Sequence, residues 1–191
     1  MAHHRILASY RGYDFFDGDR DCGYGGYRYT GATRYVAEAM CSEYGLGGGS
    51  RVLQLNSEKG FLLYEFTQTG LSIELTGVEP SRYAREKSLI KGLPSIPPVT
   101  EMYDLIIAIG VVYTLNLADA IQCLRNIDKW GWRAFITLAS YDGPEDYDLM
   151  RRWTLLGTLL LKREEWVEVM KHAGYEGDYQ FLDAKSLGLS A

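Results

Sequence analysis

Short apolar runs alternate with amphipathic stretches along most of the chain. The apolar runs have the length and composition typical of buried strands, and four of them are the clearest. Apolar residues between the runs recur at three- and four-residue steps, which is typical of helices. The alternation predicts an α/β fold, a doubly wound and mostly parallel sheet with helices on both faces and the strand order second, first, third, fourth. The four strands are expected at Val52–Leu55, Ile73–Val78, Leu105–Ile109 and Phe135–Leu138.

The expected helices follow the same pattern, and a last strand is expected at Tyr179–Leu182. Gly45–Gly49 and Gly174 interrupt the periodicity, as helix ends often do. The segment 142–148 between the fourth strand and the next helix is interpreted as a loop. Helices are predicted at Gly31–Tyr44, Phe61–Phe66, Ser81–Lys91, Leu117–Ile127, around Trp153–Leu160 and at Arg163–His172.

Residues 1–30 show neither helical nor strand periodicity and are interpreted as a loop-rich aromatic arm, followed by a single domain over residues 31–191. Glycines separate three tyrosines in the centre of the arm, Tyr24, Tyr27 and Tyr29. Because glycine lets a loop approach another surface closely, these rings are expected to form a lid over the carboxyl ends of the strands and to contact substrate. The alternative is an arm that covers one end of the sheet without touching a ligand.

Composition narrows the classes of partner. With 191 residues the chain suits one domain, and no apolar run approaches the ~20 residues of a membrane helix. A net charge of −5 disfavours nucleic acid and favours a small-molecule substrate. Nothing at the start argues for secretion, and the three cysteines fit neither a disulfide framework nor a zinc site. A cytoplasmic protein with reduced thiols and no metal is expected.

The stretch Arg51–Phe66, RVLQLNSEKGFLLYEF, combines a strand, a tight turn and the start of a helix. It resembles the first motif of class I S-adenosylmethionine-dependent methyltransferases, acidic-x-Gly-x-Gly-x-Gly. The arm sequence GYGGYRY, the pair Glu165-Trp166 and the late sequence GYEGDY are similar to those of a small bacterial subgroup. The resemblance implies a Rossmann-like fold and S-adenosylmethionine as cofactor.

The resemblance also implies where the cofactor would lie. The backbone of Asn56, Glu58 and Gly60 would hold its methionine end, and Glu79 its ribose hydroxyls, unless Glu79 is only a turn carboxylate. The adenine would lie near Ile109 and Gly110. A separate candidate at the same sheet edge is Tyr113, either a proton carrier or binding hydroxyl, or a packed aromatic ring.

Three departures from the family pattern fall at this site. The first acidic residue is Gln54, and Asn56 and Glu58 replace the first two glycines. The connector Gly92–Met102 is too short for the family's next edge strand and its adenine-contacting loop. Gly110 and Tyr113 stand where the subgroup tends to carry Asn and His. The motifs of the cofactor site therefore look degenerate.

Two functions remain open. One is a methyltransferase acting on a small polar metabolite, such as a sugar or a natural-product intermediate. The other is a degenerate descendant that no longer binds the methyl donor and either catalyses another small-molecule reaction or serves as a partner or regulatory subunit, with a protein partner or a homo-oligomer as its assembly. A nucleic-acid methyltransferase is disfavoured by the acidic charge. The impaired turn predicts an affinity for S-adenosylmethionine weaker than about 100 μM.

Overall fold

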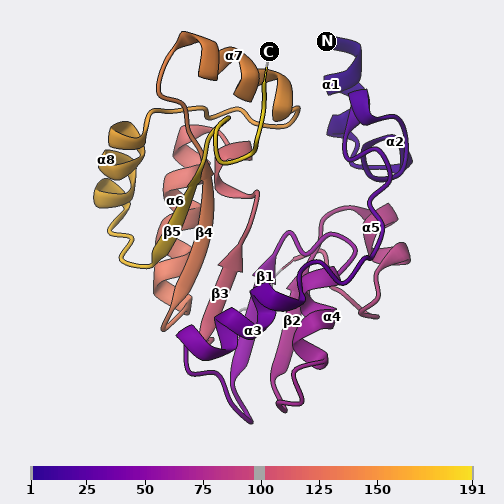
Figure 1. Ribbon diagram of the computed structural model, residues 1–191. Coiled ribbons are helices and arrows are strands. Elements are labelled where there is room, and N and C mark those ends of the chain that lie inside the picture. Colours follow the sequence, from indigo (N-terminus) through magenta and orange to yellow (C-terminus); the bar gives the residue numbers. More distant parts are fainter. Residues whose placement is uncertain (1, 97–101, 191) are drawn as a thin grey trace.

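A computed structural model of the chain describes residues 2–96 and 102–190. Helices and strands alternate through most of this range, with a cluster of short helices at the amino terminus (Figure 1). The helices are α1 (Ala2–Ser9), α2 (Tyr13–Phe16), α3 (Arg34–Glu43), α4 (Phe61–Thr67), α5 (Arg82–Lys87), α6 (Leu117–Trp130), α7 (Pro144–Trp153) and α8 (Arg163–Ala173), with 3-10 turns η1 (Arg20–Cys22) and η2 (Val112–Thr114). The strands are β1 (Arg51–Leu55), β2 (Glu74–Val78), β3 (Leu105–Ala108), β4 (Ala134–Ala139) and β5 (Asp178–Leu182).

The five strands form one parallel sheet in the order β2-β1-β3-β4-β5. The predicted order of the first four strands and their parallel pairing are confirmed. Leu53 of β1 is in register with Thr76 of β2 on one side and with Ile106 of β3 on the other. All four residues of β3 are buried, as expected for a central strand covered on both faces.

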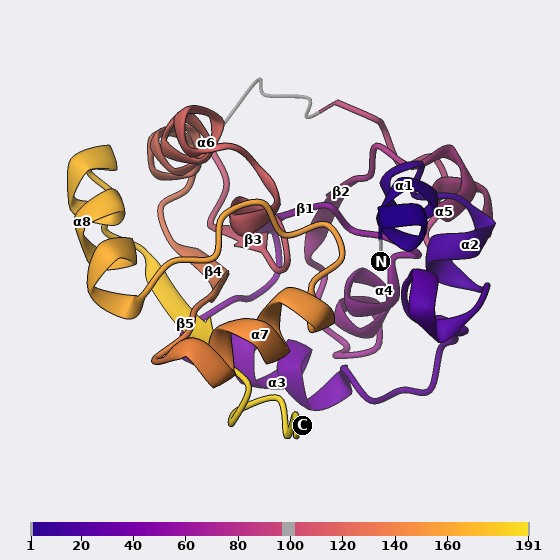
Figure 2. The ribbon, with the colours of Figure 1, turned by 90° about the horizontal axis from the view of Figure 1, so that it is seen from above.

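Two apolar layers, one on each face, hold the sheet. On one face, Leu53 and Ile106 pack with residues of α6 and α8, among them Leu124 and the fully buried Trp166. On the other face the neighbouring strand positions pack against α3 and α4 (Figure 2). Successive residues of a strand point to opposite faces, so β1 and β3 contribute to both layers. This arrangement is the doubly wound architecture predicted from the sequence.

Three predicted elements differ in the structure. Residues 1–30 contain α1, α2 and η1, so the interpretation of a loop-rich arm was wrong in that respect. These helices are too short to show a clear period and are held by contacts with the rest of the protein. The Ser81–Lys91 helix is shorter than predicted because Ser88 is extended and ends α5 at Lys87.

The predicted helix around Trp153–Leu160 was also wrong. Helix α7 lies earlier, over part of the segment interpreted as a loop, with Pro144 in its first turn and acidic residues behind it. After Trp153 the chain is not helical, because the backbone amides of Thr158 and Leu159 bond to the carbonyl oxygen of Tyr113. This segment forms a wall of the site described below.

Strand β2 is the edge of the described sheet on the side where the family would add a strand. Residues 89–96 contain no strand, and Leu93 and Pro94 instead fold back on the end of β2. The backbone amide of Glu79 donates to the carbonyl oxygen of Pro94 at 3.1 Å. The rest of the predicted Gly92–Met102 connector includes residues 97–101, which lie outside the described residues.

Candidate functional site

The turn after β1 has an unusual backbone. Asn56, Glu58 and Gly60 all lie in the left-handed region, with φ of 55°, 54° and 70°. Glycine is required at the last position, since a Cβ there would lie 2.5 Å from the Ser88 hydroxyl oxygen. Asparagine tolerates this region, but a glutamate in it carries a strain of about 1–3 kcal/mol. The turn therefore follows a glycine-type path while bearing two side chains.

Glu79, one residue beyond the end of β2, has no exposed surface. One carboxylate oxygen accepts from the backbone amide of Glu58 at 2.7 Å, and the other accepts from the amide of Ser81 at 2.7 Å. The guanidinium of Arg11 lies 3.5 Å from the second oxygen. Donors from three segments of the same chain thus surround this carboxylate.

Arg11 belongs to the arm, between α1 and α2, and joins the two turns. Its guanidinium donates to the side-chain oxygen of Asn56 at 2.6 Å, and its carbonyl oxygen accepts from the Ser81 hydroxyl. Within residues 2–96 and 102–190, Arg11, Asn56 and Glu58 are the non-glycine residues with positive φ. All three meet at this junction, and such strain is typical of functional or switch sites.

A second contact anchors the arm to the same turn. The ammonium of Lys59 lies 2.6 and 2.7 Å from the two carboxylate oxygens of Asp17 and donates to the carbonyl oxygen of Tyr27 at 2.7 Å. The Tyr83 hydroxyl also donates to Asp17 at 2.6 Å. Burial raises the pKa of Asp17, but the bonds from Lys59 and Tyr83 outweigh it and hold the pKa below its usual range. With Phe16 fully buried, the arm is a packed part of the protein.

The three tyrosines of the arm have different positions. Tyr24 donates its hydroxyl hydrogen to the Glu58 carboxylate and stacks on Tyr27, with ring centroids 4.5 Å apart. Tyr27 in turn stacks on Phe61 of α4 at 4.7 Å. Tyr29 contacts Phe61 and Tyr64 edge to face and does not line the cavity described next. Of the three, Tyr24 is the one whose side chain borders that cavity.

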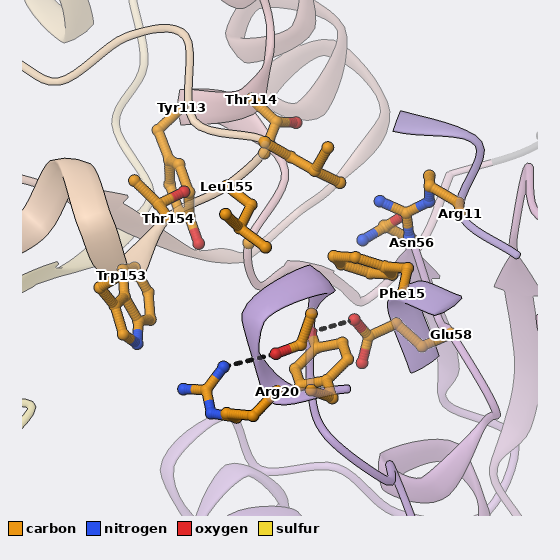
Figure 3. A pocket seen from close by; sticks show the side chains of 14 residues that line it. Arg11, Phe15, Arg20, Asn56, Glu58, Tyr113, Thr114, Trp153, Thr154 and Leu155 are labelled. Carbon is orange, nitrogen blue, oxygen red and sulfur yellow. Dashed lines mark hydrogen bonds between the residues drawn. The ribbon is translucent and has the colours of Figure 1, made fainter. Parts of the chain in front are cut away.

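A cavity of about 160 Å³ lies between the arm, the turns after β1 and β3, and the segment after α7 (Figure 3). Gly110 and Tyr113 line it, whereas Ile109 does not and is 36% exposed. Burial raises the pKa of the Glu58 carboxyl, against the opposing effect of hydrogen bonds from Tyr24 and Tyr27. The lining residues are Arg11, Phe15, Arg20, Gly23, Tyr24, Asn56, Glu58, Gly110, Tyr113, Thr114, Trp153, Thr154, Leu155 and Leu156.

No protein-family model and no curated protein matches the sequence. Solved structures do match. A putative methyltransferase of Bacillus halodurans aligns with a TM-score of 0.56 and 9% identity, over 73% of this chain and 68% of that one. A putative methyltransferase of Haloferax volcanii, in complex with the Trm112 methyltransferase activator, gives 0.53 and 15% over 75% and 74%. The [4+2]-cyclase SpnF gives 0.56 and 14% over 75% and 57%.

The chain has the class I S-adenosylmethionine-dependent methyltransferase fold. In this fold the edge formed by the carboxyl ends of the strands is the ligand-binding edge. The junction of Arg11, Asn56, Glu58 and Glu79 therefore lies where the sequence resemblance implies a cofactor.

The residues at this junction do not fit the methyl donor. A ribose needs free acceptor oxygens on Glu79, but that carboxylate is enclosed and already bonded to the amides of Glu58 and Ser81. Arg11 occupies the remaining space between Glu79 and Asn56. On the adenine side, Leu93 would be 2.8 Å from a Cβ on Gly77, so the connector packs directly against the end of β2.

Several residues of the site had no recognisable sequence signal. Arg11 lies 45 positions before Asn56, and nothing in the local sequence predicts that contact. Asp17 and Lys59 pair across a similar separation. Trp153 and Thr154 reach the cavity because α7 ends there, which the predicted helix boundaries missed.

Among the residues that the structure describes, no group of three or more His, Cys, Asp or Glu side chains is placed to hold a metal ion. Cys22 and Cys41 are buried and Cys123 is half-buried, all as free thiols. Over the same residues, no helix combines the length and apolar character needed to cross a membrane.

Proposed function

We propose that this chain is a methyltransferase-fold protein that no longer takes S-adenosylmethionine in the family's usual place and instead binds a small polar molecule in the cavity beside Glu58. One observation carries the proposal. Glu79, the carboxylate that would bind the ribose, is fully buried and satisfied by donors of its own chain, with Arg11 of the arm beside it.

An energy estimate supports weak binding of the donor. Moving Arg11 aside would leave the buried Glu79 carboxylate without its cation, and breaking a buried pair costs about 3–5 kcal/mol. Since about 1.4 kcal/mol corresponds to a tenfold change, the apparent affinity for any ligand that needs Arg11 displaced falls by a factor of roughly 10² to 4 × 10³. A ligand with an intrinsic dissociation constant of about 1 μM would then bind more weakly than about 100 μM.

Other chemistry is compatible with the fold, because a fold does not determine a reaction. One protein with a similar structure is named a [4+2]-cyclase rather than a methyltransferase. The second candidate function is methyl transfer to a small polar metabolite after Arg11 swings away. The left-handed path of Asn56, Glu58 and Gly60 favours it, since the glycine-type backbone of the turn persists.

Calorimetric titration with S-adenosylmethionine distinguishes the two. The unmodified protein is expected to bind more weakly than about 100 μM, a binding free energy smaller in magnitude than about 6 kcal/mol. Arg11→Ala and the double variant Asn56→Gly with Glu58→Gly test whether the arm and the turn are the obstacles, and each should tighten binding. Arg82→Gln is the matched control, since this exposed arginine pairs with Glu86 on the same helix, away from the cavity lining.

Saturable binding tighter than about 10 μM by the unmodified protein would overturn the proposal and favour methyl transfer. A structure with the cofactor seated against Glu79 would do the same.

We further propose that residues 1–30 and 31–191 act as one structural unit in the cytoplasm. It would assemble with a protein partner or with a second copy of the chain. The similar Haloferax volcanii protein is described in complex with an activator.

A further inference from the structure

The cavity beside Glu58 holds three kinds of reactive or binding group on different walls. Glu58 and Arg11 lie on one side, and Tyr113 and Thr154 lie on the other, with Arg20 at one end (Figure 3). Glu79 is not part of the lining, so this cavity is distinct from the enclosed Glu79 carboxylate, where the family resemblance would place the ribose. The walls belong to the arm and to the turns after β1 and β3, at the edge where doubly wound sheets bind ligands.

Guanidinium groups mark the end of the cavity near the arm. Arg20 donates to the carbonyl oxygen of Gly23, and Arg152 donates to that of Asp148 at 3.3 Å. Over residues 2–96 and 102–190 neither has a carboxylate partner within salt-bridge distance. A hollow of about 430 Å³ shares Arg20, Trp153 and Leu155 with the cavity and adds His4, Asp21 and Arg152. The hollow is lined by one aspartate and by two guanidinium groups without a carboxylate partner. This end of the cavity therefore has an excess of positive charge, which favours binding of a small anion.

Glu58 and Tyr113 supply groups that can exchange protons. The Glu58 carboxylate accepts from Tyr24, and burial raises its pKa, which brings it closer to the range suited to a general base at neutral pH. The Tyr113 hydroxyl borders the cavity, and in the described part of the chain it makes no hydrogen bond. Burial, and then the charge of Glu58, raises the pKa of Tyr113, so this hydroxyl keeps its proton and remains a donor.

We propose that this cavity is a proton-transfer site for a small 2-oxo acid, with Arg20 holding the carboxylate, Tyr113 donating to the carbonyl oxygen and Glu58 acting as the base. The inference rests on the proposed function, because it places a ligand in the cavity rather than at Glu79. Glu58 removes a proton from the carbon next to the carbonyl. That C–H bond breaks and an O–H bond forms on Glu58. The C–H electron pair forms a C=C bond to the carbonyl carbon, and the π pair of the C=O bond moves onto the oxygen, which accepts the hydrogen bond from Tyr113. Glu58 then exchanges this proton with solvent water and returns a solvent-derived hydrogen to the carbon, which completes the cycle without an oxidant or a reductant.

The size of the cavity sets the size of the ligand. A protein cavity of about 150 Å³ accommodates benzene, so a cavity of about 160 Å³ suits a molecule with about as many non-hydrogen atoms. Pyruvate is such a molecule and carries the carboxylate, the carbonyl and the acidic methyl hydrogens. At about 0.7 kcal/mol per non-hydrogen atom, roughly half of the best efficiency known for very small ligands, six atoms give about 4 kcal/mol, a dissociation constant on the order of 1 mM.

The test is solvent exchange of pyruvate. The protein is incubated with up to about 10 mM pyruvate in D₂O, and proton NMR follows the loss of the methyl signal as deuterium replaces hydrogen. The unmodified protein should accelerate this loss, and Glu58→Gln should reduce the rate by about 10²-fold or more. Arg20→Gln should raise the half-saturating pyruvate concentration by about tenfold with less effect on the maximal rate. Arg82→Gln, on the exposed α5 pair, is the control and should exchange like the unmodified protein.

Tyr113→Phe and the pH profile keep the proposal testable if Glu58→Gln does not fold. Removing the Tyr113 hydroxyl should slow exchange by about tenfold or more without unfolding the protein. The rate should rise with pH as Glu58 loses its proton. The groups facing Glu58 that influence this titration are Tyr24 and Tyr27, which bond to it, Arg11, which lowers its pKa, and Glu79, which raises it.

Two results would overturn the inference. One is that folded protein exchanges the methyl hydrogens no faster than buffer alone does at about 10 mM pyruvate, a concentration about ten times the expected dissociation constant. The other is exchange that persists in folded Glu58→Gln, which would place the base elsewhere. Neither result bears on S-adenosylmethionine, whose calorimetric titration tests the proposed function separately. Tight donor binding together with Glu58-dependent exchange would overturn the proposed function and leave the exchange site intact.

Discussion

Replacing Asp17 with asparagine should strongly destabilise the protein. The ammonium of Lys59 is almost fully buried, with its side chain 7% exposed, and lies 2.6 and 2.7 Å from the oxygens of Asp17. In the Asp17→Asn variant this ammonium would still donate to the carbonyl oxygen of Tyr27 and would still lie 5.8 Å from the centre of the Tyr27 ring. It would have no negatively charged partner. An uncompensated buried charge costs about 3–5 kcal/mol, a large fraction of the roughly 5–15 kcal/mol that stabilises a typical domain.

Urea unfolding followed by circular dichroism measures this loss, and a double-mutant cycle isolates the pair. Lys59→Met should cost less than Asp17→Asn, because Asp17 is partly exposed and keeps the Tyr83 hydroxyl. The double variant should recover about 2 kcal/mol or more relative to the sum of the single changes. Arg82→Gln removes an exposed, solvent-screened pair and should leave the urea midpoint close to that of the unmodified protein.

The same pair predicts a direction of pH dependence. Because the folded protein holds the pKa of Asp17 below its usual range, the ionised carboxylate contributes stability above the ordinary carboxyl pKa. This contribution decreases as the pH falls toward the depressed value, and Asp17→Asn should remove that part of the acid sensitivity. A loss below about 1 kcal/mol for Asp17→Asn at neutral pH, or strict additivity in the double variant, would refute the reasoning.

Three further changes test other parts of the structure. Gly60→Ala should destabilise by about 1–3 kcal/mol in urea unfolding, because φ is 70° and the new Cβ would meet Ser88, whereas Gly47→Ala, with open space around it, should be nearly neutral. Trp166→Phe should cost about 2–4 kcal/mol, since it leaves a void and an unbonded Ala139 carbonyl oxygen where the indole now donates at 2.8 Å. Phe16→Ala should cost about 3–5 kcal/mol and increase proteolysis within the arm; arm cleavage no faster than in Arg82→Gln would show that Phe16 does not anchor it.

The sheet was predictable because its signal is local. Runs such as Leu105–Ala108 are apolar at every position, which only a central parallel strand requires, and the short connections then fix the order. The boundaries of α7 were not predictable from apolar spacing, since Pro144 and the acidic first turn set its start. The cavity depends on contacts such as that of Arg11 with Asn56, which the sequence around neither residue indicates.

The changes in the turn and the position of the arm support each other physically. A glycine at position 58 would avoid the left-handed strain of about 1–3 kcal/mol but would offer the arm no side chain. With Asn56 and Glu58 in place, the arm gains a charge-assisted bond from Arg11 and a bond from Tyr24, each worth about 1.5–3 kcal/mol when one partner is ionised. The strain and the new bonds are of similar size, so the contacts of the docked arm offset the strain in the turn. Opening the arm would leave the strain without its compensation, which is why we regard the arm and the turn as one rebuilt site rather than a lid over a damaged one.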